Sequence, residues 1–367
     1  MPSPYDVVAK NVITSTLGVK PGDNVIVETW NHGLPLARAF VFNLRELGAR
    51  PLLFFEDEDT FWRCCDNLGS EQLGKVGEHE WAALEKTSSY IFIPGPADFR
   101  RMLKDRPKYL AAAAYNSEWY ERAERHRLKG ARLAFGYASA EQARVYKLPF
   151  QSWQRMLLAA SSIDISTLKN TIDKIRPLLQ GKGQIRITAP NGTDLSLRLA
   201  GRDGVAEDCI VDSDDLDKGW NIASIPGGNI VVAPDETSVE GVVFFDRSTP
   251  YMGRWVDGIR WEFRNGQLVK YSAKASAESF SSVYQKADGD KNRLGRIGIG
   301  ANPKIRRGFL QDSMSSGVIT IWLGNNQDFG GTNRTGFMFP GILGNATMSI
   351  DGHVIVEKGK LHRDMTS

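Results

Sequence analysis

The sequence is poor in cysteine. Only three occur in 367 residues: Cys64 and Cys65 are neighbours, and Cys209 stands alone. Adjacent cysteines do not bridge readily, and a disulfide framework needs several spaced pairs. The composition therefore excludes a disulfide-stapled scaffold and predicts a reducing, cytoplasmic setting.

The chain also lacks long apolar runs and an excess of one charge. No apolar stretch approaches the ~20 residues that span a bilayer, and Met1 to Asp6 contains no basic region followed by an apolar one. The 46 basic and 43 acidic residues give a net charge of +3, with no basic stripe among aromatic residues. We therefore expect neither a membrane nor a nucleic acid as partner. With 41% apolar residues, the chain can bury cores without metals or disulfides.

Histidine is scarce, and no histidine is spaced for metal binding. The five are His32, His79, His126, His353 and His362. None lies three or four residues from another, whereas a zinc or paired-metal site needs three or more His, Cys or carboxylate ligands. No phosphate-binding Gly-x-x-x-x-Gly-Lys-Ser/Thr motif occurs either. We expect no metal and no cofactor, and we keep His32, which follows a predicted strand end, as a candidate substrate-binding residue.

The first half of the chain alternates short apolar strands with helices. Four strands are predicted at 25–28, 51–55, 90–93 and 132–135. The second of these is interpreted as a buried strand and ends in the acidic run Glu56 to Asp59. Helical spacing of apolar residues predicts a helix over 34–47, which Gly48 would end. This alternation predicts an α/β domain with a mostly parallel sheet covered on both faces.

Strands joined by tight turns dominate the second half. Asn191-Gly192, Asn265-Gly266 and Asp351-Gly352 lie between alternating segments and predict β-hairpins. A helix over 277–286 interrupts the strands. Because a helix ending at Leu179 links the halves, we expect an α/β domain over 1–182 and an α+β domain over 183–367.

Several short segments occur together in an order typical of one family. They are Leu36–Ala39, Leu47–Pro51, Gly192–Leu195, Asn221–Pro226, Ala233–Pro234, Ser238–Gly241, Ile297–Pro303 and Leu323–Gly324. In this order they resemble the thermophilic metalloaminopeptidases, the aminopeptidase T and aminopeptidase S family, over nearly the whole chain. The resemblance implies the aminopeptidase T-like two-domain architecture, an active site in the second domain, and a homodimer.

The residues at the family's metal-ligand positions differ in this chain. By the resemblance, two ligand glutamates fall on Asn229 and Arg296, a histidine falls on Thr320, and a His-x-Asp pair falls on Met338 to Pro340. The related dihydroxypyridine ring-cleaving dioxygenases hold iron with a carboxylate, a His and an Asp. This chain matches at most the carboxylate, through Glu278. The resemblance therefore implies a metal-binding scaffold whose ligands are replaced.

We interpret the vacated position as a small-molecule site. Arg296 can bind a carboxylate or enolate where the charge of the metals once lay. Glu278 is the candidate base, and Asn229 and Thr320 orient the substrate or a water. The predicted substrate-binding residues are Trp322, Gln327, Phe337, Met338 and His32. The alternative is that these side chains fill the vacated space as core.

The expected function is that of a metal-independent enzyme. Its reaction would be of hydrolase or ring-opening type, on a small amide, cyclic amide or aromatic-ring compound. Two alternatives stay open at this point. One is a metal-dependent aminopeptidase whose ligands are misassigned here, and the other is a non-catalytic small-molecule-binding pseudo-enzyme. Metal content would separate the first alternative from the other two functions.

Overall fold

The computed structural model describes residues 3–101, 106–251 and 253–366. The chain forms two compact units, one of residues 1–165 and 209–227 and the other of residues 166–208 and 228–367. The boundary expected near residue 182 follows helix α10 (Ile165–Leu179), and nearly all of that helix belongs to the second unit. The first unit also takes up a segment, 209–227, that lies well beyond this boundary.

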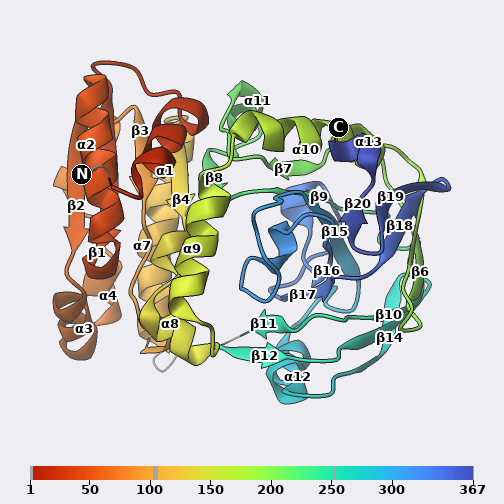
Figure 1. Cartoon of the computed structure of the whole chain (residues 1–367). Helices are drawn as coiled ribbons and strands as arrows, with labels where there is room; N and C mark the ends of the chain where they lie inside the picture. The colour runs from red at the N-terminus through yellow and green to blue at the C-terminus, as the bar shows by residue number, and fades with distance from the viewer. Residues whose placement is uncertain (1–2, 102–105, 252, 367) are drawn as a thin grey trace. The chain divides into compact units, whose positions relative to one another are not determined.

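The first unit is built on a five-stranded parallel sheet (Figure 1). Its strand order is β2 (Arg50–Glu56), β1 (Asn24–Trp30), β3 (Ser89–Phe92), β4 (Lys129–Leu133) and β8 (Ile222–Ile225). Every neighbouring pair runs parallel, which confirms the predicted parallel sheet of an α/β domain. The last strand comes from the distant segment 209–227, which explains why that segment belongs to this unit.

Helices pack on this sheet. Helix α2 (Leu34–Leu47) has its predicted bounds, contacts β1 and β2, and ends at Gly48, whose φ of +87° suits glycine. Figure 1 shows α1 (Asp6–Asn11), α2 and α9 (Phe150–Ser161) along one side of the sheet. Helices α5 (Glu78–Glu85) and α7 (Arg106–Arg125) supply Leu84, Trp119 and Ala123 to a core cluster with Ile26, Tyr90 and Phe92 of the strands. The first unit also contains α3 (Glu58–Asn67), α4 (Ser70–Leu73), α8 (Ala140–Val145) and α11 (Ser213–Asp217).

Strand β2 differs from the prediction that it is buried. It lies at the edge of the sheet, and Leu52, Leu53 and Phe55 are 47%, 41% and 47% exposed. Pro51 is compatible with this edge position, because proline cannot donate to a sheet ladder. An apolar run predicts a strand, but the pairing of distant strands decides which strand lies at the edge.

The second unit contains two large antiparallel sheets. The eight-stranded sheet has the order β14 (Gln267–Ser272), β13 (Arg260–Arg264), β10 (Glu240–Phe244), β6 (Asp194–Arg198), β5 (Gln184–Thr188), β18 (Thr347–Ile350), β19 (His353–Glu357) and β20 (Lys360–Leu361). The five-stranded sheet has the order β17 (Met338–Leu343), β16 (Ile319–Gly324), β15 (Leu294–Gly300), β9 (Asn229–Val232) and β7 (Val205–Glu207). Strands β11 (Thr249–Tyr251) and β12 (Arg254–Val256) form a separate pair, and α12 (Ala277–Lys286) has its predicted bounds.

The three predicted hairpins are confirmed. Strands β5 and β6 pair around Asn191-Gly192, β13 and β14 around Asn265-Gly266, and β18 and β19 around Asp351-Gly352. In the last two turns both central residues have positive φ, 49° and 74° in one and 49° and 84° in the other. This is the turn geometry that matches the twist of the flanking strands.

One face of the five-stranded sheet is entirely apolar. Ile297, Ile299, Ile319, Ile321 and Leu323 alternate with residues of the opposite face and are 0% exposed. This face therefore supplies core, and any chemistry of the sheet belongs to its other face. Within the described ranges, no helix of either unit is long and apolar enough to span a membrane.

Candidate functional site

The register of the five-stranded sheet brings several predicted site residues to one face. Directly opposite residues of antiparallel strands share a face. Asn229 lies opposite Gly300, Thr320 opposite Gly298, Arg296 opposite Trp322, and Met338 opposite Gly324. We call the surface made by Asn229, Arg296, Gly298, Gly300, Thr320, Trp322 and Met338 the site face.

The residues of the site face do not form one cluster. In the register, Arg296 and Asn229 are four residues apart along the strands, which is about 13 Å at 3.3–3.4 Å per residue. The Arg296 Nε donates to the Asn325 carbonyl at 3.2 Å, and its Cζ lies 4.1 Å from the Phe329 ring centroid. Both contacts come from the loop that follows β16, on the side away from Thr320. Burial lowers the pKa of Arg296, against the opposing attraction of Asp328.

Asn229 and Thr320 carry buried polar atoms without partners. Their side chains are 4% and 0% exposed. Among the described residues, neither the Asn229 Oδ1 nor the Thr320 Oγ1 has a hydrogen-bond partner. A buried polar atom left unpaired costs about 1–3 kcal/mol, so two on one sheet face need an explanation.

Trp322 occupies the middle of the site face. Gly298 has no side chain, and a Cβ built there would lie 3.0 Å from the Trp322 Cζ3 and 3.0 Å from the Val231 Cγ2. The indole therefore lies against the bare backbone of Gly298, between the Arg296 end and the Asn229 end of the face. This close approach explains the glycine at position 298, because a side chain there would crowd the ring.

A carboxylate that sequence reasoning missed lies on the same face. Glu207, the last residue of β7, pairs directly with Asn229. Its side chain is half-buried, and its backbone carbonyl accepts the Gly228 N–H at 2.6 Å. A strand of three residues leaves no periodic signal in the sequence, so only the pairing of β7 with β9 reveals this position.

A buried polar network holds the loop after β16. Arg202 donates to both carboxylate oxygens of Glu236 at 2.8 and 3.1 Å, and Asn326 Nδ2 donates to Glu236 Oε1 at 2.8 Å. Burial alone would raise the pKa of Glu236, but hydrogen bonds from Arg202, Thr332 and Asn326 bring it below its ordinary value. The network fixes the loop that carries Phe329, the ring stacked on Arg296.

The other predicted substrate-binding residues of this unit lie at the margins of the site face or in the core. Gln327 is exposed in the short 3-10 helix Gln327–Phe329, and Met338 is 43% exposed. Phe337 is 1% exposed and packs against Phe280 and Tyr284 of α12. The position of Phe337 is that of a core residue.

Glu278 and His32 lie on other elements. Glu278 is exposed in the first turn of α12, where a carboxylate also favours the helix dipole. His32 belongs to the first unit, where its Nε2 lies 2.8 Å from the Gly136 carbonyl oxygen and its buried Nδ1 has no partner among the described residues. The register that places Asn229, Arg296 and Thr320 on one sheet face does not include these two residues.

The side chains of the site face do not fit a metal centre. The side chains on this face supply an amide, a guanidinium, a hydroxyl, an indole and the single carboxylate of Glu207, whereas zinc and similar ions require three or more imidazole, thiolate or carboxylate ligands. Throughout residues 3–101, 106–251 and 253–366, no three His, Cys, Asp or Glu side chains are grouped so that they could hold a metal ion. The donor set on this face therefore disagrees with metal binding.

Two solved structures have a fold similar to that of this chain. The structure is similar to that of wild-type AmpT from Thermus thermophilus, with a TM-score of 0.74 and 18% identity over 98% of each chain. It is also similar to 2,5-dihydroxypyridine dioxygenase from Pseudomonas putida KT2440, with a TM-score of 0.63 and 14% identity over 99% of this chain and 98% of the other. No curated protein matches the sequence.

A family model matches the sequence itself, whereas the two similar structures show only the fold. The model of the thermophilic metalloprotease family M29 matches residues 5–313, which include Asn229, Arg296 and the strands that carry them. The match covers all of the first unit except residues 1–4, and most of the second. On this match, the chain belongs to the thermophilic metalloprotease family M29.

Proposed function

We propose that this member of the family works without the metals, as an enzyme that binds a small molecule on the site face. The observation that carries the proposal is the register that puts Asn229, Thr320 and the Arg296 guanidinium on one sheet face. A guanidinium next to a bound metal ion would be repelled by it. The same guanidinium supplies a fixed positive charge for an anionic ligand.

Each residue of the site face suits one part of such a ligand. The two terminal amino groups of Arg296 donate no hydrogen bond to any described residue. They are therefore available to a carboxylate or an enolate. Trp322 offers the face of an indole to a flat ring. The unpaired oxygens of Asn229 and Thr320 would become useful to a ligand once the indole shifts away from Gly298.

The reaction class we propose is hydrolysis or ring opening of a small amide, cyclic amide or aromatic-ring compound. Arg296 would stabilise the developing negative charge, which is the largest contribution in many such reactions. Glu207 takes precedence over Glu278 as the candidate base, because Glu207 shares the site face through its pairing with Asn229. A base must come within hydrogen-bond reach of the proton it removes.

One observation favours a second candidate, a non-catalytic binding protein. The Trp322 ring lies against Gly298, in the middle of the site face, and the buried oxygens of Asn229 and Thr320 are closed off from solvent. A pseudo-enzyme would keep this packed arrangement and bind its ligand only at the Arg296 end.

A panel of amides, cyclic amides and hydroxylated aromatic acids tests the proposal, with metal analysis of the same protein. We expect turnover that a chelator does not change and that Arg296→Ala lowers by at least about 100-fold, the effect of losing one oxyanion donor. The matched control is Arg254→Ala, an exposed arginine of β12 in the same unit, which should behave as the parent. Stoichiometric zinc, cobalt, manganese or iron would contradict the proposal, and ligand-induced melting shifts without any product would favour the pseudo-enzyme.

A further inference from the structure

The first unit contains a cavity of about 560 Å³ that the proposed function does not use. It opens where the strands end: Trp30 closes β1, Glu56 closes β2, and Gly95 and Pro96 follow β3. In the strand order β2-β1-β3, the chain passes from β1 to β2 on one side and then crosses to β3 on the other side of β1. Ligands of parallel α/β sheets bind at the carboxyl ends of strands at such a switch point.

Three carboxylates from different elements line this cavity. They are Glu28 of β1, Glu56 of β2 and Glu80 of α5. Glu80 accepts hydrogen bonds from the Tyr115 hydroxyl at 2.5 Å and from the Gly77 N–H at 2.6 Å. In the described ranges, the carboxylates of Glu28 and Glu56 have neither a hydrogen bond nor an ion pair, and the described lining includes no Lys or Arg.

The negative charge of this cavity lies in an apolar layer. In the sheet register, Glu28 is flanked by Phe54 on one side and Phe92 on the other. Burial, followed by the charges of Glu56 and Glu80, raises the pKa of Glu28 from its ordinary 4.5 to about 7. Burial also raises the pKa of Glu56. Groups in this state gain strongly from a cation that replaces lost solvation.

The remaining walls are aromatic. Trp30 and Phe61 meet edge to face with centroids 4.9 Å apart, and Phe54 and Trp119 meet in the same way at 6.2 Å. The indole N–H of Trp119 is buried and has no partner among the described residues. Indole and phenyl faces attract an ammonium group, and they accommodate an apolar body beside it.

We propose that this cavity binds a small organic cation, a primary ammonium group carried on an apolar or aromatic body. A metal ion is the less suitable occupant, because no three carboxylate, His or Cys side chains of the described chain are grouped closely enough to coordinate one. A neutral ligand would leave Glu28 and Glu56 without a counter-charge. The ammonium would lie between these two carboxylates, and its body would contact Trp30 and Phe61.

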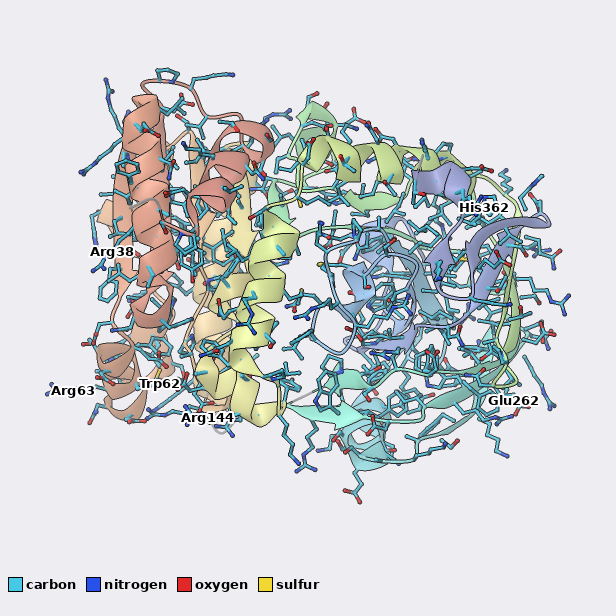
Figure 2. The ribbon with its side chains drawn as sticks, viewed as in Figure 1. Arg38, Trp62, Arg63, Arg144, Glu262 and His362 are labelled. Atoms are coloured by element: carbon cyan, nitrogen blue, oxygen red, sulfur yellow. The ribbon has the colours of Figure 1, made fainter. Side chains whose placement is uncertain are left out.

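Isothermal titration of the full-length protein with phenethylammonium tests this proposal, with 2-phenylethanol as the neutral analogue of the same shape. We expect the ammonium to bind at least tenfold more tightly than the alcohol. The double variant Glu28→Gln/Glu56→Gln should weaken ammonium binding at least tenfold. The matched control is Glu262→Gln, which removes a carboxylate of β13 in the second unit (Figure 2) and should leave binding unchanged.

The pH and a competing metal ion make the test sharper. Binding of the ammonium should strengthen as the pH rises from 6 to 8, because Glu28 ionises in that range. The other titratable groups that line the cavity are Glu56, Glu80, Cys64, His79 and Tyr115. Millimolar Mg²⁺ should not compete. Equal affinity for the alcohol, unchanged binding in the double variant, displacement by Mg²⁺, or no binding of phenethylammonium would each overturn the proposal.

Discussion

At the scale of single residues, Glu28 links stability to pH. Its pKa is about 7 in the folded chain and 4.5 ordinarily. Because the folded value is the higher one, protonated Glu28 contributes to the free energy of unfolding. This contribution is complete below about pH 4.5 and is lost as the pH rises through about 7. The groups that act on it or face it are Glu56, Glu80, Tyr90, Tyr115 and Tyr120.

Glu28→Gln should therefore stabilise the protein more at pH 8 than at pH 5. A shift of this size corresponds to about 3 kcal/mol at most, at 1.36 kcal/mol per pKa unit. Urea unfolding of the parent and the variant at both pH values measures the difference. Equal stabilisation at pH 5 and pH 8 would show that ionisation of Glu28 costs the folded chain nothing.

Thr320 offers a second test at the scale of one residue. Its hydroxyl is buried and unpaired in the described structure, so Thr320→Val should stabilise the chain by about 1 kcal/mol. Thr249 of β11 is also 0% exposed with an unpaired hydroxyl, but it lies off the site face. Thr249→Val should stabilise similarly, while only Thr320→Val should change ligand binding or turnover. A loss of stability in Thr320→Val would mean that its hydroxyl has a partner after all.

At the scale of elements, the loop after β16 depends on one side chain. Asn326 is 0% exposed, donates to Glu236 and to the Gly295 carbonyl, and accepts the Asn333 N–H. Its removal leaves several buried groups unpaired at once. The loop also carries Phe329, so its order decides where the Arg296 guanidinium lies.

Asn326→Ala should lower the free energy of unfolding by about 2–4 kcal/mol, since each orphaned buried group costs about 1–3 kcal/mol. It should also make the loop more sensitive to limited proteolysis. Asn345→Ala, at an exposed asparagine of the same unit, is the control and should change neither property. If Asn326→Ala unfolds at the same urea concentration as the parent, the network does not hold the loop.

At the scale of the whole molecule, the two compact units are not two consecutive pieces of sequence. Strand β8 completes the parallel sheet of the first unit by pairing with β4, although it lies in the second half of the sequence. Without it, β4 would become an edge, although Ala131 and Leu133 of that strand are now fully buried. An exposed apolar edge strand invites aggregation.

A fragment of residues 1–182 should therefore unfold without a cooperative transition or aggregate. A fragment in which a Gly-Ser linker joins residues 1–165 to 209–227 should regain a cooperative transition, because it restores the pairing of β4 with β8. Circular dichroism during heating, with sedimentation to detect aggregates, distinguishes the two. Cooperative melting of the 1–182 fragment would show that β8 is dispensable.

The sequence by itself determined the local elements and the residue types on the site face. The bounds of α2 and α12, the three hairpins, the parallel sheet and the family all follow from patterns within a few residues or from ordered motifs. Helical and strand periods and Asn-Gly or Asp-Gly turns act over such short distances, so a single chain reveals them.

Only the tertiary structure decided which residues meet across distant strands. The edge position of β2, the return of β8, the pairing of Glu207 with Asn229 and the Trp322 ring against Gly298 depend on register between segments far apart in sequence. The carboxylates around the cavity of the first unit come together for the same reason, from β1, β2 and α5. A one-residue change of register would turn any of these strand side chains to the other face of its sheet, and no local pattern in the sequence records that choice.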